Sequence, residues 1–231
     1  MLVKNWMSQP VITVEVSDTI KLANQLLNKN RIRSLPVLSE GELVGIVTDR
    51  DLKRASISET AGLESHEIIY LNTRIELSEI MTENPITVTP ETTVDEVAKI
   101  LLKHKISGVP VVNDSGNLVG IITQGDIFKL LISLTGIEAE GVQIAVQIED
   151  KAGTVKEIAD IVRSLGGRIG SLLTSYDDVP DGYRNAYFKA YQVAPEKIDD
   201  LINLLKEKAK LQYVIEHLGN NQPSIVRMME E

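Results

Sequence analysis

The chain has 231 residues, enough for one to two domains, and its apolar and charged fractions of 43% and 25% are typical of a folded globular protein. The formal net charge of -9 disfavours nonspecific binding to nucleic acids and anionic membranes, which carry the same sign. The absence of cysteine excludes disulfides, iron–sulfur clusters and thiolate zinc sites. No signal-peptide core or long apolar stretch is visible, so we expect a cytoplasmic protein that binds neither membranes nor nucleic acid.

The first half of the chain contains an internal repeat. The copy that starts at Met7 reads MSQPVITVEVSDTIKLANQLLNKNRIRSLPVLSEGELVGIVTDRDL, and the copy that starts at Met81 reads MTENPITVTPETTVDEVAKILLKHKISGVPVVNDSGNLVGIITQGDI. Both copies predict a βαββα order, with strands at 12–14, 35–38 and 43–47, and at 86–88, 109–112 and 118–122. One such unit buries too little core to be stable alone, so we expect the two copies to pack around a pseudo-twofold axis.

The first helix of the second copy has clear sequence signals. Val94, Val97, Ala98 and Leu101 share one helical face, and Thr93 with Glu96 predicts a capping box before them.

Each copy ends in Thr-x-x-Asp at a strand-to-helix junction, as Thr48 with Asp51 and as Thr123 with Asp126. A ribose diol requires a carboxylate acceptor, and a phosphate requires hydroxyl, N–H or cationic donors, which a helix N-terminus also supplies. The pattern is also that of a capping box, so a purely structural role is the alternative.

Two runs carry a family resemblance: LVGIVTDRD at 43–51 and LVGIITQGD at 118–126. Together with the shared element order they resemble CBS domains, the cystathionine-β-synthase type, and the tandem pair resembles a Bateman module. The resemblance covers roughly residues 1–135, with one repeat at 1–68 and the other at 69–135. It implies that the aspartates bind ribose and the threonines ribose or phosphate of an adenine nucleotide.

We expect the two sites to differ in charge. Arg50, Lys53 and Arg54 surround the first motif in sequence, whereas Gly125 stands at the position of Arg50 in the second copy. Arg31 and Arg33 precede the next strand of the first copy, where the second has Lys105 and Ser107. Such a cluster in an acidic chain indicates a polyanionic ligand, with a solvated basic face as the alternative. The expected nucleotide-binding residues are Thr13, Val14, Arg31, Arg33, Ser34, Pro36, Thr48, Arg50, Asp51, Thr87, Val88, Lys105, Ser107, Val109, Pro110, Thr123 and Asp126.

The expected base contacts within that set, namely the strand residues at 13–14 and 87–88 and the segments 34–36 and 108–110, are equally good core residues.

A connector at 136–141 leads to a second domain at 142–219, followed by a tail at 220–231 without a clear pattern. Strict alternation from Val142 to Ile148 predicts a strand, and a Thr154–Glu157 capping box predicts the next helix. Further elements give the order βαββαβ, which is ferredoxin-like, with a second helix carrying Ile198, Leu201, Ile202 and Leu205 on one face and a last strand at 213–218.

Asp150-Lys-Ala-Gly153 at the first strand–helix turn, and Gly167-Arg-Ile169 later, resemble an ACT domain, a small module that often dimerises and binds amino acids. Asp150, Ala152, Gly153 and Thr154 are then the candidate amino-acid contacts, although Ala152 stands where that turn frequently has proline. A structural turn in a dimerising sheet is the alternative. The combination of a CBS pair with an ACT domain resembles the acetoin-utilisation protein B type of bacterial regulator.

We therefore expect an α/β (α+β) regulatory protein that is not an enzyme, forms a homodimer, and senses AMP, ADP, ATP or an S-adenosyl compound as regulatory ligand on behalf of an unknown partner. The three histidines are His66, His104 and His217, and none lies in a metal-binding motif, so no metal or catalytic cofactor is expected. The alternative is a protein-interaction scaffold that binds no nucleotide.

Overall fold

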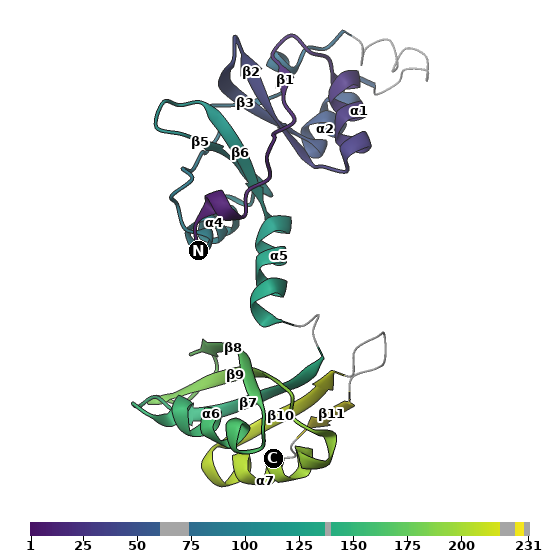
Figure 1. Cartoon of the computed structure of the whole chain (residues 1–231). Helices are drawn as coiled ribbons and strands as arrows, with labels where there is room; N and C mark the ends of the chain where they lie inside the picture. The colour runs from purple at the N-terminus through teal and green to yellow at the C-terminus, as the bar shows by residue number, and fades with distance from the viewer. Residues whose placement is uncertain (61–73, 137–139, 218–224, 229–231) are drawn as a thin grey trace. The chain divides into compact units, whose positions relative to one another are not determined.

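The computed structural model describes residues 1–60, 74–136, 140–217 and 225–228, and it consists of two compact units, Met1–Lys129 and Leu130–Glu231. The expected boundary between the two repeats at 68/69 lies outside the described residues. The elements that begin in the first unit, shown in Figure 1, are η1 (Val3–Asn5), β1 (Val14–Glu15), α1 (Ile20–Asn30), β2 (Ser34–Ser39), β3 (Glu42–Thr48), α2 (Asp49–Thr60), η2 (Leu77–Glu79), β4 (Thr82–Glu83), α4 (Val94–His104), β5 (Gly108–Val112), β6 (Leu118–Thr123) and α5 (Gln124–Thr135).

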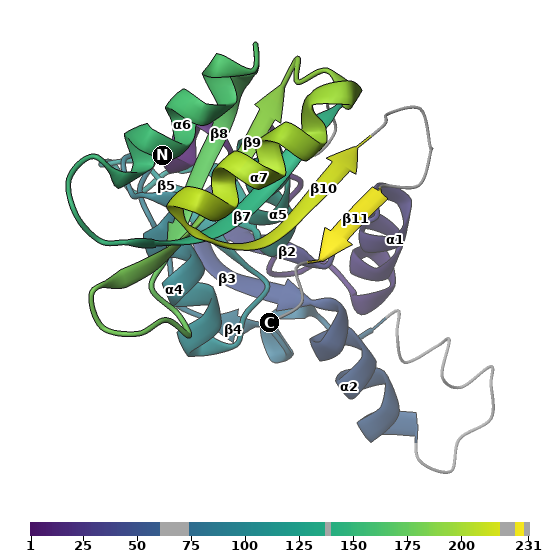
Figure 2. The ribbon, with the colours of Figure 1, turned by 90° about the horizontal axis from the view of Figure 1, so that it is seen from below.

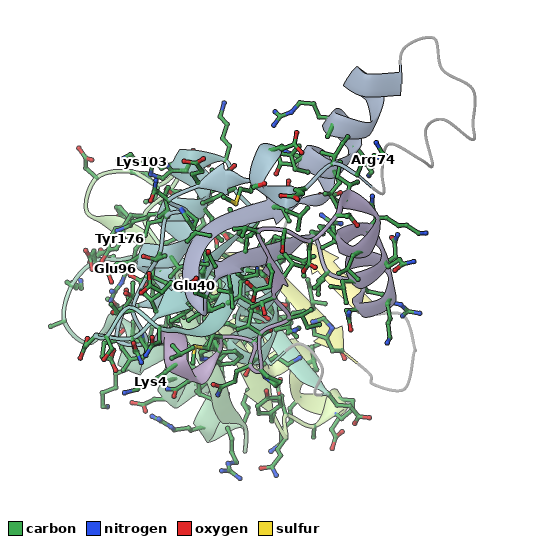
Figure 3. All side chains as sticks on the ribbon, turned by 90° about the horizontal axis from the view of Figure 1, so that it is seen from above. Lys4, Glu40, Arg74, Glu96, Lys103 and Tyr176 are labelled. Atoms are coloured by element: carbon green, nitrogen blue, oxygen red, sulfur yellow. The ribbon has the colours of Figure 1, made fainter. Side chains whose placement is uncertain are left out.

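The predicted hairpins and helices of both repeats are present. β2 pairs with β3 and β5 pairs with β6, each antiparallel. The capping box of α4 is confirmed: the Thr93 hydroxyl accepts from the Glu96 N–H, and the Glu96 carboxylate (labelled in Figure 3) accepts from the Thr93 N–H over 3.0 Å. Val94, Val97 and Leu101 are buried, so the predicted apolar face of α4 is the one that packs on the core.

The segments that lead into each repeat are exchanged between the repeats. The N-terminal segment packs on the second repeat, where the Val3 N–H donates to Thr92 O over 2.9 Å and Ser8 forms a β-bridge with Ile121. In the same way, the Leu77 N–H donates to Asp18 O over 2.8 Å, and β4 pairs with β3 of the first repeat. Figure 1 shows the consequence, with the N-terminus beside α4.

This exchange shortens the first strand of each repeat. The strand expected at 12–14 is reduced to β1, Val14–Glu15, which pairs in parallel with β2, and in the second repeat only Val88 forms an isolated bridge, to Val111. The reason is that the chain between Ser8 and Val14 crosses from one repeat to the other, so its backbone cannot stay in one sheet.

The second unit is an antiparallel sheet covered by two helices. Its elements are β7 (Gly141–Glu149), α6 (Thr154–Ser164), β8 (Arg168–Ser175), β9 (Tyr183–Tyr191), η3 (Pro195–Lys197), α7 (Ile198–Lys208), β10 (Lys210–His217) and β11 (Ile225–Met228), and the strand order in the sheet is β11-β10-β7-β9-β8. Figure 2 shows α6 and α7 side by side across one face of this sheet. Residues of both helices, such as Ile158 and Leu201, form one core with alternate residues of β7 and β9, such as Ile144 and Phe188.

The order βαββαβ predicted for this unit is observed, with two differences. The expected Thr154–Glu157 capping box is not formed: Gly153 is the N-cap, with φ of 98°, and the Thr154 hydroxyl instead donates to Glu149 O and Lys151 O over 2.9 and 3.0 Å. Because Gly153 adopts the left-handed region, the helix begins one residue earlier than the capping-box pattern requires. The tail without a predicted element contains β11, which pairs with β10; Leu218, the expected end of the preceding strand, lies outside the described residues.

Candidate functional site

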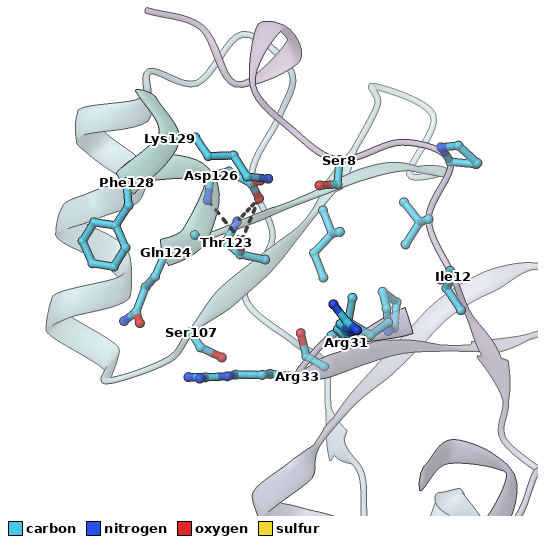
Figure 4. Close-up of a pocket in the computed structure, with 17 residues that line it drawn as sticks. Ser8, Ile12, Arg31, Arg33, Ser107, Thr123, Gln124, Asp126, Phe128 and Lys129 are labelled. Carbon is cyan, nitrogen blue, oxygen red and sulfur yellow. Dashed lines mark hydrogen bonds and ion pairs between the residues drawn. The ribbon is translucent and has the colours of Figure 1, made fainter. Parts of the chain in front are cut away.

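Two cavities in the first unit are related by the internal repeat. One, of about 520 Å³, contains Thr123 and Asp126, and we name it the Asp126 cavity. The other, of about 480 Å³, contains Thr48 and Asp51, and we name it the Asp51 cavity. Each combines the Thr-x-x-Asp motif of one repeat with the lead segment that is docked beside it, and both volumes fall in the range of small-molecule sites. The Asp126 cavity (Figure 4) is lined by Ser8, Pro10, Val11, Ile12, Arg31, Ile32, Arg33, Ser34, Pro36, Ser107, Ile121, Thr123, Gln124, Gly125, Asp126, Phe128 and Lys129.

The Asp51 cavity has the matching set from the opposite repeats. It is lined by Arg33, Ser34, Ile46, Thr48, Asp49, Arg50, Asp51, Arg54, Thr82, Asn84, Pro85, Ile86, Lys105, Ile106, Ser107, Gly108, Pro110 and Gln124. In both cavities a proline and an isoleucine of the lead segment region, such as Pro85 and Ile86, provide apolar surface, while the motif and several cations provide polar contacts.

The Thr-x-x-Asp geometry is the same in both repeats. The Thr48 hydroxyl donates to Asp51 Oδ2 over 2.6 Å, and the Thr48 N–H donates to the same oxygen over 3.0 Å. The corresponding Thr123 distances to Asp126 Oδ2 are 2.7 and 3.0 Å. The aspartate therefore caps its helix with Oδ2, and these hydrogen bonds confirm that the motif acts as a helix cap in both repeats.

The second carboxylate oxygen of each aspartate pairs with an exposed cation one turn further along the helix. Asp51 Oδ1 pairs with Arg54 over 3.1 Å, and Asp126 Oδ1 pairs with Lys129 over 3.2 Å. The Arg54 and Lys129 side chains are 78% and 74% exposed, whereas the two aspartates are 15% and 6% exposed. Such surface pairs contribute little net stability, so a ligand hydroxyl can take the cation's place at Oδ1 at low cost.

The cations do not gather around one motif as their order in the sequence indicates. Arg50 and Arg54 line the Asp51 cavity, but Arg31 lines the Asp126 cavity, and its repeat counterpart Lys105 lines the Asp51 cavity. Arg33 lines both cavities (Figure 4 shows it extended beside Ser107). Lys53 lines neither and pairs with Asp49 over 3.5 Å on the surface of α2.

Five of the expected nucleotide contacts lie outside both linings. Val14, Val88 and Val109 are buried in the core, Thr87 is exposed on its lead segment, and Thr13 lines a separate, open hollow near the β2–β3 turn. The remaining twelve line one cavity or both: Arg31, Arg33, Ser34, Pro36, Thr48, Arg50, Asp51, Lys105, Ser107, Pro110, Thr123 and Asp126.

Sequence reasoning missed several lining residues. Pro10, Val11, Asn84 and Pro85 lie in the crossing segments, and Phe128 lies on α5 beyond the motif. The two crossing segments occupy equivalent positions in the repeat, and this equivalence was the available sign that they share a role. Their place beside the motif of the opposite repeat follows from the exchange of lead segments, which the sequence does not show.

The chain matches a known family over its repeats. The CBS domain model matches residues 3–58 and 77–133. A CBS domain-containing protein of Dictyostelium discoideum is 35% identical over 135 residues, which is 58% of this chain and 93% of that protein. The chain belongs to the CBS domain family and carries a tandem CBS pair.

Among solved structures, a protein described as AcuB, of acetoin utilization, from Vibrio cholerae is 30% identical, covers 59% of this chain and 94% of that chain, and has a TM-score of 0.50. The CBS domain pair of protein MJ0100, crystallised with 5′-methylthioadenosine and S-adenosyl-L-methionine, is 38% identical and covers 57% of this chain and 99% of that chain. The TM-score of that match is 0.49, so neither the fold nor the site is assigned from it.

Within the described ranges, no helix is long and apolar enough to cross a membrane. Over the same residues, no group of His, Asp and Glu side chains is arranged to hold a metal ion.

Proposed function

We propose that the protein is a regulatory sensor that binds an adenine nucleotide or adenosyl compound in the Asp51 and Asp126 cavities. The observation that supports this proposal is the pairing in each cavity of an aspartate held at a helix N-terminus with cations and an apolar wall. A purely structural cap requires only the threonine and aspartate, and not the neighbouring cavity.

The ribose fits the free side of each aspartate. With Oδ2 fixed by the threonine, Oδ1 faces an exposed cation and is available to accept from a ribose hydroxyl. The displaced cation, Arg54 or Lys129, can then reach a phosphate oxygen. This arrangement uses one carboxylate for the helix cap and for the ligand at the same time.

The base and the phosphates fit the remaining walls. Val11, Ile12 and Pro36 give the Asp126 cavity an apolar side suited to an adenine ring, and Arg31 and Arg33 give it donors for phosphate. In the Asp51 cavity, Ile86 and Pro110 take the place of Ile12 and Pro36, and Arg50 adds a cation that the Asp126 cavity lacks.

Isothermal titration and thermal shift with AMP, ADP, ATP, S-adenosylmethionine and NADH test this proposal. A ligand at a hundred times its dissociation constant adds ~2.7 kcal/mol to the stability of the folded protein. Binding of an adenine compound that is weakened in both Asp51→Asn and Asp126→Asn supports the sensor function. Unchanged stability with all five compounds supports the scaffold alternative.

A homodimer through α5 is the proposed route for the signal. Phe128, Leu131 and Ile132, at helix positions i, i+3 and i+4, are 61%, 51% and 43% exposed, so they form an apolar stripe open to a partner. Phe128 also lines the Asp126 cavity, which links the stripe to the ligand. Leu131→Glu is expected to lower the molar mass measured by light scattering to that of a monomer, while Lys103→Glu, on the exposed side of α4, leaves it unchanged.

For the second unit we propose an ACT-like role in dimerisation or in binding a second small ligand. The strand order β10-β7-β9-β8 and the helix-covered single face support the domain type. The amino-acid contacts Asp150, Ala152, Gly153 and Thr154 stay a prediction, supported by the N-cap of α6, where Gly153 has no side chain to hydrogen-bond the helix N–H groups. Thermal shift with the common amino acids tests it, and a Gly153→Val variant that keeps a wild-type response to the amino acid contradicts this placement.

A further inference from the structure

The two cavities share a wall. Arg33, Ser34, Ser107 and Gln124 line both of them; the first three lie at the starts of β2 and β5, and Gln124 lies at the start of α5. The backbone holds this wall symmetrically, since the Asp49 N–H donates to Arg33 O over 3.1 Å and the Gln124 N–H donates to Ser107 O over 2.9 Å.

The side chains of this wall are not symmetric. Arg33 occupies the position in the first repeat that Ser107 occupies in the second, so the shared wall has one guanidinium and no matching cation. Within the described residues, no hydrogen bond or ion pair engages the Arg33 side chain. Its guanidinium is therefore free to turn to either cavity.

From this geometry we infer that Arg33 couples the two cavities, so that a phosphate-bearing ligand in one weakens the binding of a phosphate-bearing ligand in the other. The inference rests on the proposed function. A guanidinium binds one phosphate well, through two parallel N–H donors. The second phosphate then loses that partner and meets the negative charge of the first across a shared wall, which adds repulsion.

The two cavities differ in the cations that remain to each of them when Arg33 binds a ligand in the other cavity. The Asp51 cavity keeps Arg50, Arg54 and Lys105, whereas the Asp126 cavity keeps Arg31 and Lys129. The Asp51 cavity thus keeps one cation more, although the carboxylates of Asp49 and Asp51 also line it, where the Asp126 cavity has Asp126. With a phosphorylated nucleotide bound there, the Asp126 cavity is left to favour an adenosine derivative that carries little negative charge.

The experiment is titration calorimetry of the full chain with ADP and, separately, with adenosine, which has the same base and ribose but no phosphate. Asp51→Asn and Asp126→Asn isolate each cavity and give its affinity without a neighbour. We expect the second ADP to bind wild type with an affinity at least about fivefold lower than the affinity of the same cavity measured in isolation. This is a typical size for coupling between sites. Adenosine is expected to bind both cavities without this loss of affinity at the second one.

Arg33→Ser gives the wall the serine that its repeat counterpart already has, and it is expected to lower the coupling between ADP molecules by removing the part that competition for Arg33 causes. Arg31→Ser is the matched control, because it removes a cation that lines one cavity alone; it weakens that cavity and leaves the coupling in place. Raising the salt concentration in wild type is expected to reduce the coupling as well, which tests the inference without any substitution.

The outcomes separate the two proposals. Two ADP molecules that bind wild type with the affinities of the isolated cavities overturn the inference and leave the proposed function standing. Coupling that is as large in Arg33→Ser as in wild type, or that adenosine shows equally, overturns the role of Arg33. No binding of either compound overturns the proposed function, and this inference with it.

Discussion

Arg31 and Lys105 occupy the same position in the two repeats and share an uncommon backbone conformation, with φ of 54° and 55° directly after α1 and α4. Helices commonly end in this left-handed region, but glycine or asparagine usually stands there, because other residues strain their Cβ. Both repeats instead place a long cation at this cap, and each cation lines a cavity. Under the proposed function, the strained cap of each repeat places a positive charge at a ligand site.

Arg31→Gly is expected to separate stability from binding. Relief of the left-handed strain stabilises the first unit by up to about 1 kcal/mol, less the extra backbone freedom that glycine gives the unfolded chain. Loss of the cation weakens ADP binding in the Asp126 cavity. Denaturation followed by the fluorescence of Trp6, the single tryptophan, measures the first, and calorimetry measures the second. A variant that is destabilised and binds ADP normally contradicts both parts.

Substitution of Asp51 is expected to have two separable effects. The carboxylate caps α2 through Oδ2, so Asp51→Ala is expected to cost about 1 kcal/mol of stability as well as the proposed ribose contact. Asp51→Asn keeps an acceptor suited to the cap but loses the charge at Oδ1, so its stability stays near that of wild type while nucleotide binding falls.

Comparing the unfolding midpoints and the ADP affinities of the two Asp51 variants decides the matter. If Asp51→Asn binds nucleotide as well as wild type does, the aspartate acts as a cap alone. That result favours the scaffold alternative for this cavity.

The glycines in the middle of β3 and β6 are expected to resist any added side chain. A Cβ on Gly45 would overlap the Met81 sulfur and lie 3.3 Å from Thr82 O, and one on Gly120 would meet Met7 in the same way. These methionines belong to the exchanged lead segments, so Gly45→Ala forces the docked segment outward, at a cost of about 1–3 kcal/mol.

Trp6 fluorescence during urea unfolding measures this cost. Gly125→Ala is the matched control, because the added Cβ near the start of α5 would meet only the Thr123 hydroxyl at 3.5 Å, an ordinary contact. It is expected to be neutral or slightly stabilising. Combining Gly45→Ala with Met81→Ala should recover part of the loss; a loss that is unchanged in the double variant indicates another cause.

The sequence was sufficient for most of the elements and their buried faces but not for the way in which the elements pair. Ile198, Leu201, Ile202 and Leu205, placed on one face by their spacing, are all buried in the second unit. The CBS pair was recognisable from two nine-residue runs together with the element order that both copies share. Helical spacing and alternation are local signals, and they report which side of an element is apolar.

The cavities could not be assembled from such local signals. Which motif Arg31 faces depends on the exchange of lead segments, and this exchange rests on long-range contacts such as the Ser8–Ile121 bridge. Strand β11 was missed for a related reason. A pattern of four residues at a sheet edge is too short to be distinguished from a loop. Only their pairing with β10 shows that these residues form a strand.

The stability of the second unit is expected to fall as the pH drops below about 6.5. Burial and the nearby positive charge of Lys189 lower the pKa of His217 from its ordinary value of 6.5. The unfolded chain therefore takes up the proton before the folded chain does, so the stabilisation is complete above pH 6.5 and is lost as the pH falls through the folded pKa. Lys189 is itself buried, which lowers its pKa.

Differential scanning calorimetry of the full chain between pH 7.5 and about 5.5 measures this effect above the ordinary carboxylate range. Trp6 fluorescence identifies the transition of the first unit, so the other transition belongs to the second. His217→Gln removes the titrating ring and is expected to flatten the pH dependence of the second transition. His104→Gln, on the exposed surface of α4, is the control and keeps the wild-type slope. A slope that survives in His217→Gln assigns the proton uptake to another group.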